Sequence, residues 1–305
     1  MNEITNKLLE MISDWKVGFT GAFNIRENGE CAGRRSSENI TISPKADKSG
    51  IVITVKSAAQ KETVYIPACV TKSGVDDLVY NDFVIEDGAD VIIVAGCGVH
   101  SDGEEEARHN GIHTFSIGAR AKVLYREKHI GVGTGSGAKR INPVTDVRMG
   151  RNAYMEMDTM QISGVTDTNR TTKAVLDAGA KLVIRERLLT DGKERAKSVF
   201  DVSLDGQDSG VDIVSRSVLK GDSYQEYHSV IRGNCRCSGH SECDAILADR
   251  GRVRAVPELY AGDINASLIH EAAIGKIAGE QIIKLRTLGL SEEEAERKII
   301  EGFLK

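Results

Sequence analysis

Prolines, aromatic side chains and long apolar runs are all scarce in this 305-residue chain. With 4 prolines in all, proline-rich linkers between domains are not expected. No apolar run approaches the roughly 20 residues that a membrane-spanning helix needs. The opening MNEIT lacks the features of a signal peptide. A formal net charge of −5 argues against nucleic-acid binding, which needs a basic face. We therefore expect neither a membrane nor a nucleic acid as partner.

Cysteine is the next informative residue type. The chain has 6 cysteines, and its opening residues do not resemble a secretion signal. In a chain of this length, that combination indicates free thiols in a reducing compartment and not a disulfide framework. Apolar residues at 40% and charged residues at 28% are ordinary for a globular protein. The expected localisation is cytoplasmic.

Short β-branched runs, separated by Gly, Asp and Asn, predict strands over most of the chain. Typical runs are residues 51–55 (IVITV) and 91–94 (VIIV). Three strand entrances share a Gly-Ala corner, at Gly88, Gly118 and Gly179. Glycine permits the positive φ of a tight corner, and the alanine lets the next coil pack closely. A recurring strand–turn unit favours a solenoid of parallel strands from about residue 40 to residue 266.

An antiparallel sandwich stays open as an alternative, since the Asn-Gly pair at 110–111 and the Asp-Gly pair at 191–192 are typical of hairpins. Helices are expected at both ends of the chain. Apolar residues at helical spacing over residues 3–15 predict a short amphipathic helix. Residues 280–288 and 291–303 predict a helical hairpin, with Gly289 ending the first helix and a capping box beginning the second.

The expected domains are therefore a helical or irregular segment over residues 1–39, a β core over 40–278 and the hairpin over 279–305. A helix pair at the end of a solenoid is expected to cover the last coil with one face and to leave its other face free.

The side chains best suited to bind transition metals lie between Cys235 and Glu271. This window holds three cysteines, two histidines and a glutamate at its end, and thiolates favour zinc or iron–sulfur clusters. Buried cysteines and a histidine in a turn are an equally plain interpretation, because free cysteine often acts as a small hydrophobe.

The same window resembles the C-terminal signature of the SufB/SufD family. The residues that carry the resemblance are 242–247 (ECDAIL), 268–277 (LIHEAAIGKI), 280–286 (EQIIKLR) and 288–290 (LGL). The similarity is close over residues 211–303 and looser back to about residue 79, and the chain looks most like the compact archaeal-type members. The resemblance implies a right-handed parallel β-helix core with a short N-terminal helix and a C-terminal helical hairpin. It also implies a scaffold on which iron–sulfur clusters are assembled, and not an enzyme.

Site residues carry over from the family one by one. Cys243 matches the cysteine implicated in accepting sulfur and holding the nascent cluster. Glu271 matches a proposed cluster ligand, and His270 occupies a histidine position of the family. Ile269 departs from the pattern, because bacterial SufB commonly has a glutamate there. Strand alternation places His270 and Glu271 on opposite faces, so both can face one cluster only through a bulge or a dimer seam.

Cys235, Cys237 and His240 are additional candidate ligands that the bacterial pattern does not require. They offer soft and borderline donors that would replace the missing carboxylate, or they line a turn.

The implied partners are a SufC-type ATPase that docks on the C-terminal hairpin, a second SufBD protomer in a homodimer, and a sulfur donor such as a cysteine desulfurase. Lys284, Arg286 and Glu292 are expected to point outward and to contact the ATPase. The chain itself is expected to hold a transient iron–sulfur cluster and no nucleotide. Its glycine-rich segment at residues 131–140 fails the phosphate-loop pattern.

Two rival functions remain. The first is a structural zinc or regulatory metal protein built on Cys237, His240 and Cys243. The second is a SufD-like structural subunit without a cluster of its own, against which the presence of both Cys243 and Glu271 argues.

Residues 97–113 carry a secondary hypothesis of metal handling. Cys97, three histidines and several carboxylates fall within this segment, although an acidic surface loop is the ordinary explanation.

Overall fold

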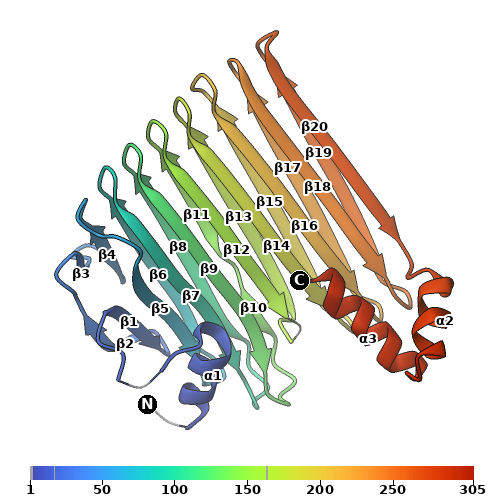
Figure 1. Cartoon of the computed structure of the whole chain (residues 1–305). Coiled ribbons are helices and arrows are strands. Elements are labelled where there is room, and N and C mark those ends of the chain that lie inside the picture. The colour runs from blue at the N-terminus through green and yellow to red at the C-terminus, as the bar shows by residue number, and fades with distance from the viewer. Residues whose placement is uncertain (1–2, 17, 163) are drawn as a thin grey trace.

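The computed structural model describes residues 3–16, 18–162 and 164–305, and within these ranges the chain winds into a β-solenoid of about 8 turns (Figure 1). Three helices complete the described part of the chain: α1 (Glu3–Ser13) at the N-terminal end, and α2 (Gly279–Thr287) and α3 (Glu292–Phe303) at the C-terminal end. None of these helices is long and apolar enough to cross a membrane.

Two sheets of ten strands each form the walls of the solenoid. Sheet A contains, in spatial order, β2 (Glu30–Arg35), β1 (Ala22–Glu27), β5 (Glu62–Val70), β7 (Asp90–His100), β9 (Lys122–Val132), β12 (Tyr154–Ile162), β14 (Lys181–Thr190), β16 (Gly210–Leu219), β18 (Cys237–Leu247) and β20 (Ala266–Gly275). Sheet B contains β19 (Arg252–Ala261), β17 (Tyr224–Gly233), β15 (Arg195–Leu204), β13 (Asp167–Leu176), β10 (Lys139–Ile141), β11 (Val144–Met149), β8 (Ala107–Ile117), β6 (Asp76–Ile85), β4 (Gly50–Val55) and β3 (Ile40–Pro44).

The predicted parallel solenoid is confirmed, and the antiparallel sandwich is wrong. From β4 onward, neighbouring strands within each sheet pair in parallel, as in the run of β14, β16 and β18. The chain alternates between the sheets, and every second side chain points into the core. The exceptions lie at the N-terminal end, where β3 pairs antiparallel with β4 although residue 40 was expected to begin the parallel core. The segment before residue 40 contributes two further strands, β1 and β2.

The corners of the solenoid recur, but not in the register that the Gly-Ala pattern predicted. Left-handed residues stand at Gly88 (φ 72°), Arg120 (φ 59°), Asn152 (φ 56°) and Gly179 (φ 69°), and a buried alanine follows each of them. At the second corner, Arg120 therefore takes the position that the sequence pattern gave to Gly118. Asparagine adopts this conformation more readily than most residues, which explains why a glycine search missed a corner.

The two ends of the solenoid differ. At the N-terminal end, the antiparallel strands β2 and β3 terminate the sheets, and α1 buries Leu8, Leu9 and Ile12 against the core. At the C-terminal end, β19 and β20 each pair with a neighbour on one side only. We call this end, formed by residues 252–275, the open edge.

The C-terminal hairpin is confirmed as a helix pair, with Gly289 (φ 94°) after α2 and a capping box of Ser291 and Glu294 at the start of α3. The expectation that it covers the last coil is wrong. The helix α3 lies instead beside the lower ends of the sheet A strands (Figure 1), where Lys220, the residue directly after β16, forms a salt bridge of 3.2 Å with Glu296. The open edge is therefore left uncovered.

Candidate functional site

Strands β18 and β20 bring the predicted site residues together. They pair in parallel, so that Ser241 lies opposite His270 and Glu242 lies opposite Glu271. Because side chains alternate along a strand, one set of residues points into the solenoid and the other points to its outer face. The predicted separation of His270 from Glu271 is borne out by their different partners, described below.

The inward set contains Cys243, which is fully buried in the hydrophobic core. Burial, and next the negative charges of Glu186 and Asp244, raise the pKa of its thiol to about 12. The thiol is therefore protonated and shielded in this conformation, whereas thiolate is the reactive and metal-binding form. Cys243 lies one strand away from the open edge, so only β20 separates its strand from a free sheet edge.

His270 belongs to the inward set as well. Its Nδ1 lies 3.1 Å from Oγ of Ser241, which is also 2.7 Å from the hydroxyl of Tyr227. Burial lowers the pKa of His270 below its usual value, so the neutral imidazole is favoured at neutral pH. From strand spacing, the Cα atoms of His270 and Cys243 lie about 8 Å apart on the same face. Thiol and imidazole thus share one interior region at the open end.

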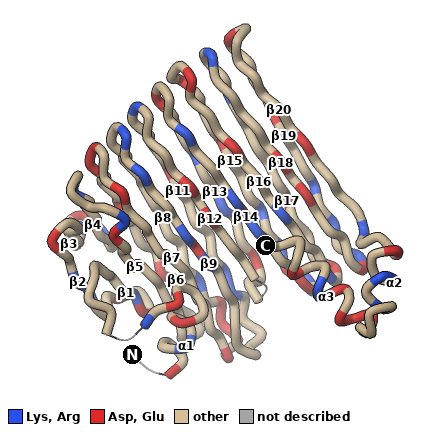
Figure 2. The backbone as a smooth tube through the Cα atoms, viewed as in Figure 1, with Lys and Arg blue, Asp and Glu red and all other residues tan. Residues whose placement is uncertain are grey.

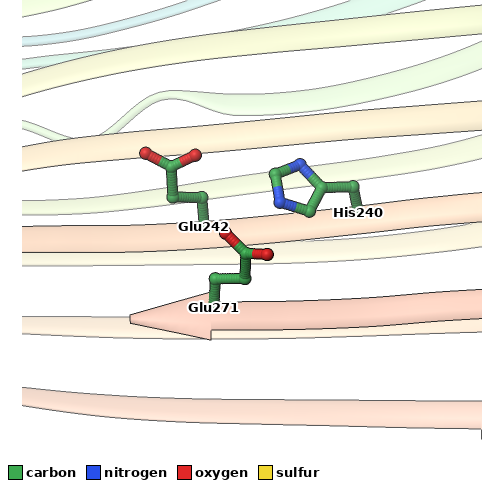
Figure 3. A group of neighbouring side chains, drawn as sticks. All are labelled: His240, Glu242 and Glu271. Atoms are coloured by element: carbon green, nitrogen blue, oxygen red, sulfur yellow. The ribbon is translucent and has the colours of Figure 1, made fainter. Parts of the chain in front are cut away.

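The outward set consists of His240, Glu242 and Glu271 (Figure 3). One potential ligand atom from each of these residues lies within 4.8 Å of the others. His240 and Glu242 come from β18, and Glu271 comes from the edge strand β20. We call this group the outer trio. Its potential ligand atoms are one nitrogen and two oxygens, with no sulfur.

A carboxylate outside the outer trio fixes the orientation of its histidine. Asp212 on β16 lies 2.7 Å from Nδ1 of His240 and also accepts a hydrogen bond from Arg185. Burial raises the pKa of Asp212, but the hydrogen bonds from His240 and Arg185 outweigh it, so this pKa is lowered. The charged carboxylate therefore holds a proton on Nδ1 of His240 and leaves Nε2 as its metal-binding nitrogen.

The remaining cysteines of the window lie far from Cys243. Cys235 and Cys237 are buried near the corner that precedes β18. Six residues of extended strand separate Cys237 from Cys243, which is about 20 Å. His240, in addition, points to the other face. The structure thus does not bring together the three ligands of the zinc site that the sequence suggested.

Glu242 and Asp212 are site residues that the sequence analysis missed. A signal for Glu242 was present, because residues two apart on a strand share a face and Glu242 follows His240 at that spacing. Asp212 lies 28 residues from its histidine, and only the stacking of β16 on β18 brings the two together.

In residues 97–113, the side chains of Cys97, His109 and His113 are buried, whereas Asp102, Glu104 and Glu105 are exposed. His109 lies 3.0 Å from Asp77, and His113 forms a hydrogen bond with the hydroxyl of Tyr125. Burial is the main reason why the pKa of Cys97 is raised well above its usual value. Cys97, His109 and His113 line one small cavity with Glu127, but in the part of the chain that the structure describes their donor atoms are not close enough to one another to form a metal-binding group, so the secondary hypothesis gains no support.

A buried ionic network occupies the middle of the solenoid. Arg170 on β13 forms a salt bridge of 2.6 Å with Glu127 and a second of 3.5 Å with Glu186. Glu186 accepts hydrogen bonds from Ser198 and Ser215, and Ser215 lies opposite Cys243 in the β16–β18 register. Against the effect of burial, His129 and Arg170 lower the pKa of Glu127, whereas burial keeps the pKa of Glu186 raised despite Arg170. The network reaches the strand next to the thiol.

Fold and site together define a class of protein: a parallel β-solenoid whose last turn gathers thiol, imidazole and carboxylate groups. A family model described as "SUF system FeS cluster assembly, SufBD core domain" matches residues 76–303. This chain belongs to the SufBD family of iron–sulfur cluster assembly proteins.

Relatives of this family occur in archaea. The chain is 30% identical over 278 residues to an iron–sulfur cluster assembly SufBD family protein of Archaeoglobus fulgidus. This match covers 85% of this chain and 69% of that protein. It is 28% identical over 268 residues to a SufBD family protein of Methanothermobacter thermautotrophicus strain Delta H. That match covers 85% of this chain but 63% of the relative, so the chain spans less than two thirds of that protein.

Proposed function

We propose that this protein is a scaffold on which a transient iron–sulfur cluster is assembled, with Cys243 as the sulfur acceptor. The observation that carries the proposal is the placement of Cys243, His270 and Glu271 on the adjacent strands β18 and β20, with the thiol and the imidazole on the inner face and the carboxylate on the outer face of the edge strand. Thiolate, imidazole and carboxylate are all iron ligands. The protein supplies ligands and a protected space, while the sulfur comes from a donor such as a cysteine desulfurase.

The proposal requires a motion that exposes Cys243, since its thiol is buried and protonated in this conformation. The helix α3 is attached to the strand adjacent to that thiol. Arg216 on β16 donates a hydrogen bond of 3.3 Å to the carbonyl of Phe303, and β16 pairs directly with β18. A pull on the hairpin would act on β16 and so on Cys243.

The partner that supplies this pull is, in the proposal, a SufC-type ATPase bound to α2 and α3. Every residue of α2 is at least partly exposed, and Ile283 is 62% and Leu288 74% exposed. An apolar helix face that is left uncovered is suited to the groove of a partner. Lys284, Arg286 and Glu292 surround this face as exposed charges, and the helices carry both signs of charge (Figure 2).

Charge reversal on the hairpin tests this partner. Lys284→Glu, Arg286→Glu and Glu292→Lys are each expected to weaken binding of the ATPase at least tenfold, because charges at the rim of an interface steer and orient the partner. Thermal stability should not fall, since all three side chains are exposed. Affinity is measured by calorimetry with the purified ATPase.

Lys173→Glu is the matched control, because Lys173 is an exposed lysine on β13, away from the hairpin. Full co-purification of the ATPase with all three hairpin variants would sink the docking hypothesis.

The open edge is proposed to bind a second copy of this chain. Unpaired strand edges recruit further strands, and this edge carries exposed apolar side chains, among them Tyr260 (61%), Ile269 (51%) and Ile274 (45%). Pairing of β20 with the β20 strand of a second copy would place Glu271 of both protomers at a common seam. Cys243 of each protomer would then lie one strand away from that seam. That is the arrangement through which His270 and Glu271, on opposite faces, would contribute to one cluster.

Ile274→Lys is expected to convert the dimer to a monomer, because a lysine on an edge strand opposes strand pairing. Light scattering after size-exclusion chromatography gives the mass. Val175→Lys serves as the control, since Val175 is an apolar residue of similar exposure (42%) on β13, inside sheet B. A monomeric wild-type protein would contradict the self-association.

The test of the scaffold function itself is anaerobic co-expression of the chain with its ATPase, followed by absorbance spectroscopy and an assay of iron and acid-labile sulfide. Sulfur-to-iron charge-transfer bands with matching amounts of iron and sulfide are expected. Zinc without charge-transfer absorption would favour the rival metal protein, and the absence of any metal would favour the SufD-like subunit.

A further inference from the structure

We propose that the outer trio of His240, Glu242 and Glu271 binds one divalent transition-metal ion, separately from the interior thiol. In the cell this ion would be ferrous iron, an assignment that rests on the proposed scaffold function. Figure 3 shows the three side chains gathered on the outer side of β18 and β20. The site would receive iron before a cluster exists.

The geometry of the outer trio is close to that of a metal site. Ligand atoms of all three residues lie within 4.8 Å of one another. Nitrogen and oxygen ligands at about 2.1 Å from an ion in a tetrahedral site lie about 3.4 Å apart, so the groups need to close by at most about 1.4 Å. Glu271 is exposed on the edge strand and has the freedom to do so.

The orientation of His240 is built in before any ion arrives. Asp212 accepts from Nδ1 at 2.7 Å and is held in turn by Arg185, so Nε2 is left for a ligand. A histidine held by a carboxylate in this way is the usual arrangement around metals in proteins.

The charge of the outer trio also points to a cation, as a comparison with sheet B makes clear. On β17, Glu226 and His228 repeat the spacing of Glu242 and His240. There, Glu226 is neutralised by salt bridges with Lys197 and Arg254. Among the described residues, by contrast, no basic side chain forms a salt bridge with Glu242 or Glu271. Arg216 attracts Glu242 from beyond salt-bridge distance, and Asp244 adds a third carboxyl group beside Glu242, so a bound cation would compensate the remaining negative charge.

The donor set selects the class of ion. One imidazole and two carboxylates suit iron(II), manganese(II) or zinc(II), whereas copper(I) prefers thiolates. Cys243 points to the opposite face of β18 and does not join this set. The site is accessible, because Asp212, His240 and Glu242 line a groove of about 550 Å³ on the outer face of sheet A. Acidic and basic side chains both line this groove, and the basic ones are Arg185, Arg187, Arg216 and Lys305.

The experiment uses the full chain, freed of metal, and cobalt(II) as the probe. Titration followed by visible absorption is expected to show bands of a cobalt ion with nitrogen and oxygen ligands, without sulfur-to-cobalt charge transfer. His240→Ala and Glu242→Gln are each expected to lower cobalt affinity at least tenfold. Asp212→Asn should lower it about 10–100-fold, since it removes the group that orients the histidine.

His228→Ala and Glu226→Gln are the matched controls on β17 and should leave cobalt affinity within twofold of wild type. Circular dichroism establishes that each variant is folded. Cys243→Ser should keep the cobalt site while losing cluster formation, which separates this inference from the scaffold function. Unchanged affinity in Glu242→Gln would overturn the assignment, and so would a charge-transfer band that disappears in Cys243→Ser.

Discussion

Replacing Cys243 by serine is expected to abolish cluster formation and to leave the fold intact. Serine keeps the size of the side chain in the core but removes the sulfur that accepts and holds the cluster. No other cysteine substitutes for it, because Cys237 lies about 20 Å away along the same strand. The measurement is iron and sulfide content after anaerobic co-expression with the ATPase, with circular dichroism as the check on folding.

Cys235→Ser and Cys237→Ser are the matched controls, since both cysteines are buried in the same core. Their effect on cluster yield is expected to be small. A normal yield in Cys243→Ser would defeat the assignment of the sulfur acceptor. An equal loss in all three variants would mean that the core tolerates no serine, and the role of Cys243 in particular would then be rejected.

Replacing Arg170 by methionine is expected to lower the free energy of unfolding by about 3–5 kcal/mol, because it leaves buried carboxylates without their counter-charge. Arg170 is 3% exposed and contacts Glu127 and Glu186 at 2.6 and 3.5 Å. Chemical denaturation followed by circular dichroism measures the loss.

The loss should be smaller at pH 5 than at pH 7. Burial already raises the pKa of Glu186 in the native protein, and without Arg170 burial is expected to raise the pKa of Glu127 above its value in the unfolded chain as well. Protonation then favours the folded state as the pH falls, and this contribution is lost as the pH rises. Arg232→Met is the control, because Arg232 is 40% exposed in its pair with Asp201 and such pairs contribute about 0–1 kcal/mol. Equal effects of the two substitutions would refute the role given to burial.

Much of the architecture follows from local patterns in the chain. Runs of β-branched residues predict the strands, and the apolar stripes with Gly289 and the Ser291 capping box predict the C-terminal hairpin. The corners were predicted less well. The residue with the left-handed backbone conformation is a glycine at residue 88, but it is Arg120 and Asn152 at the next two corners. A corner is defined by backbone conformation, and more than one residue type adopts it.

The position of the hairpin was decided by tertiary packing. Sequence periodicity gives a helix its apolar face but not the surface that face meets. The salt bridge of Lys220 with Glu296 and the hydrogen bond of Arg216 to Phe303 place α3 along sheet A. Because α3 packs along sheet A, it does not cover β19 and β20 of the last turn.

By itself, the sequence determined which residue types are available for metal chemistry, and strand alternation already assigned His270 and Glu271 to opposite faces. It did not determine which residues from different turns meet. In a solenoid, residues about 28 positions apart become neighbours through strand stacking, as Asp212 and His240 do. The tertiary structure alone therefore decided that Cys243 is enclosed beside a buried ionic network, while the outer trio stands on the opposite face of the same strand.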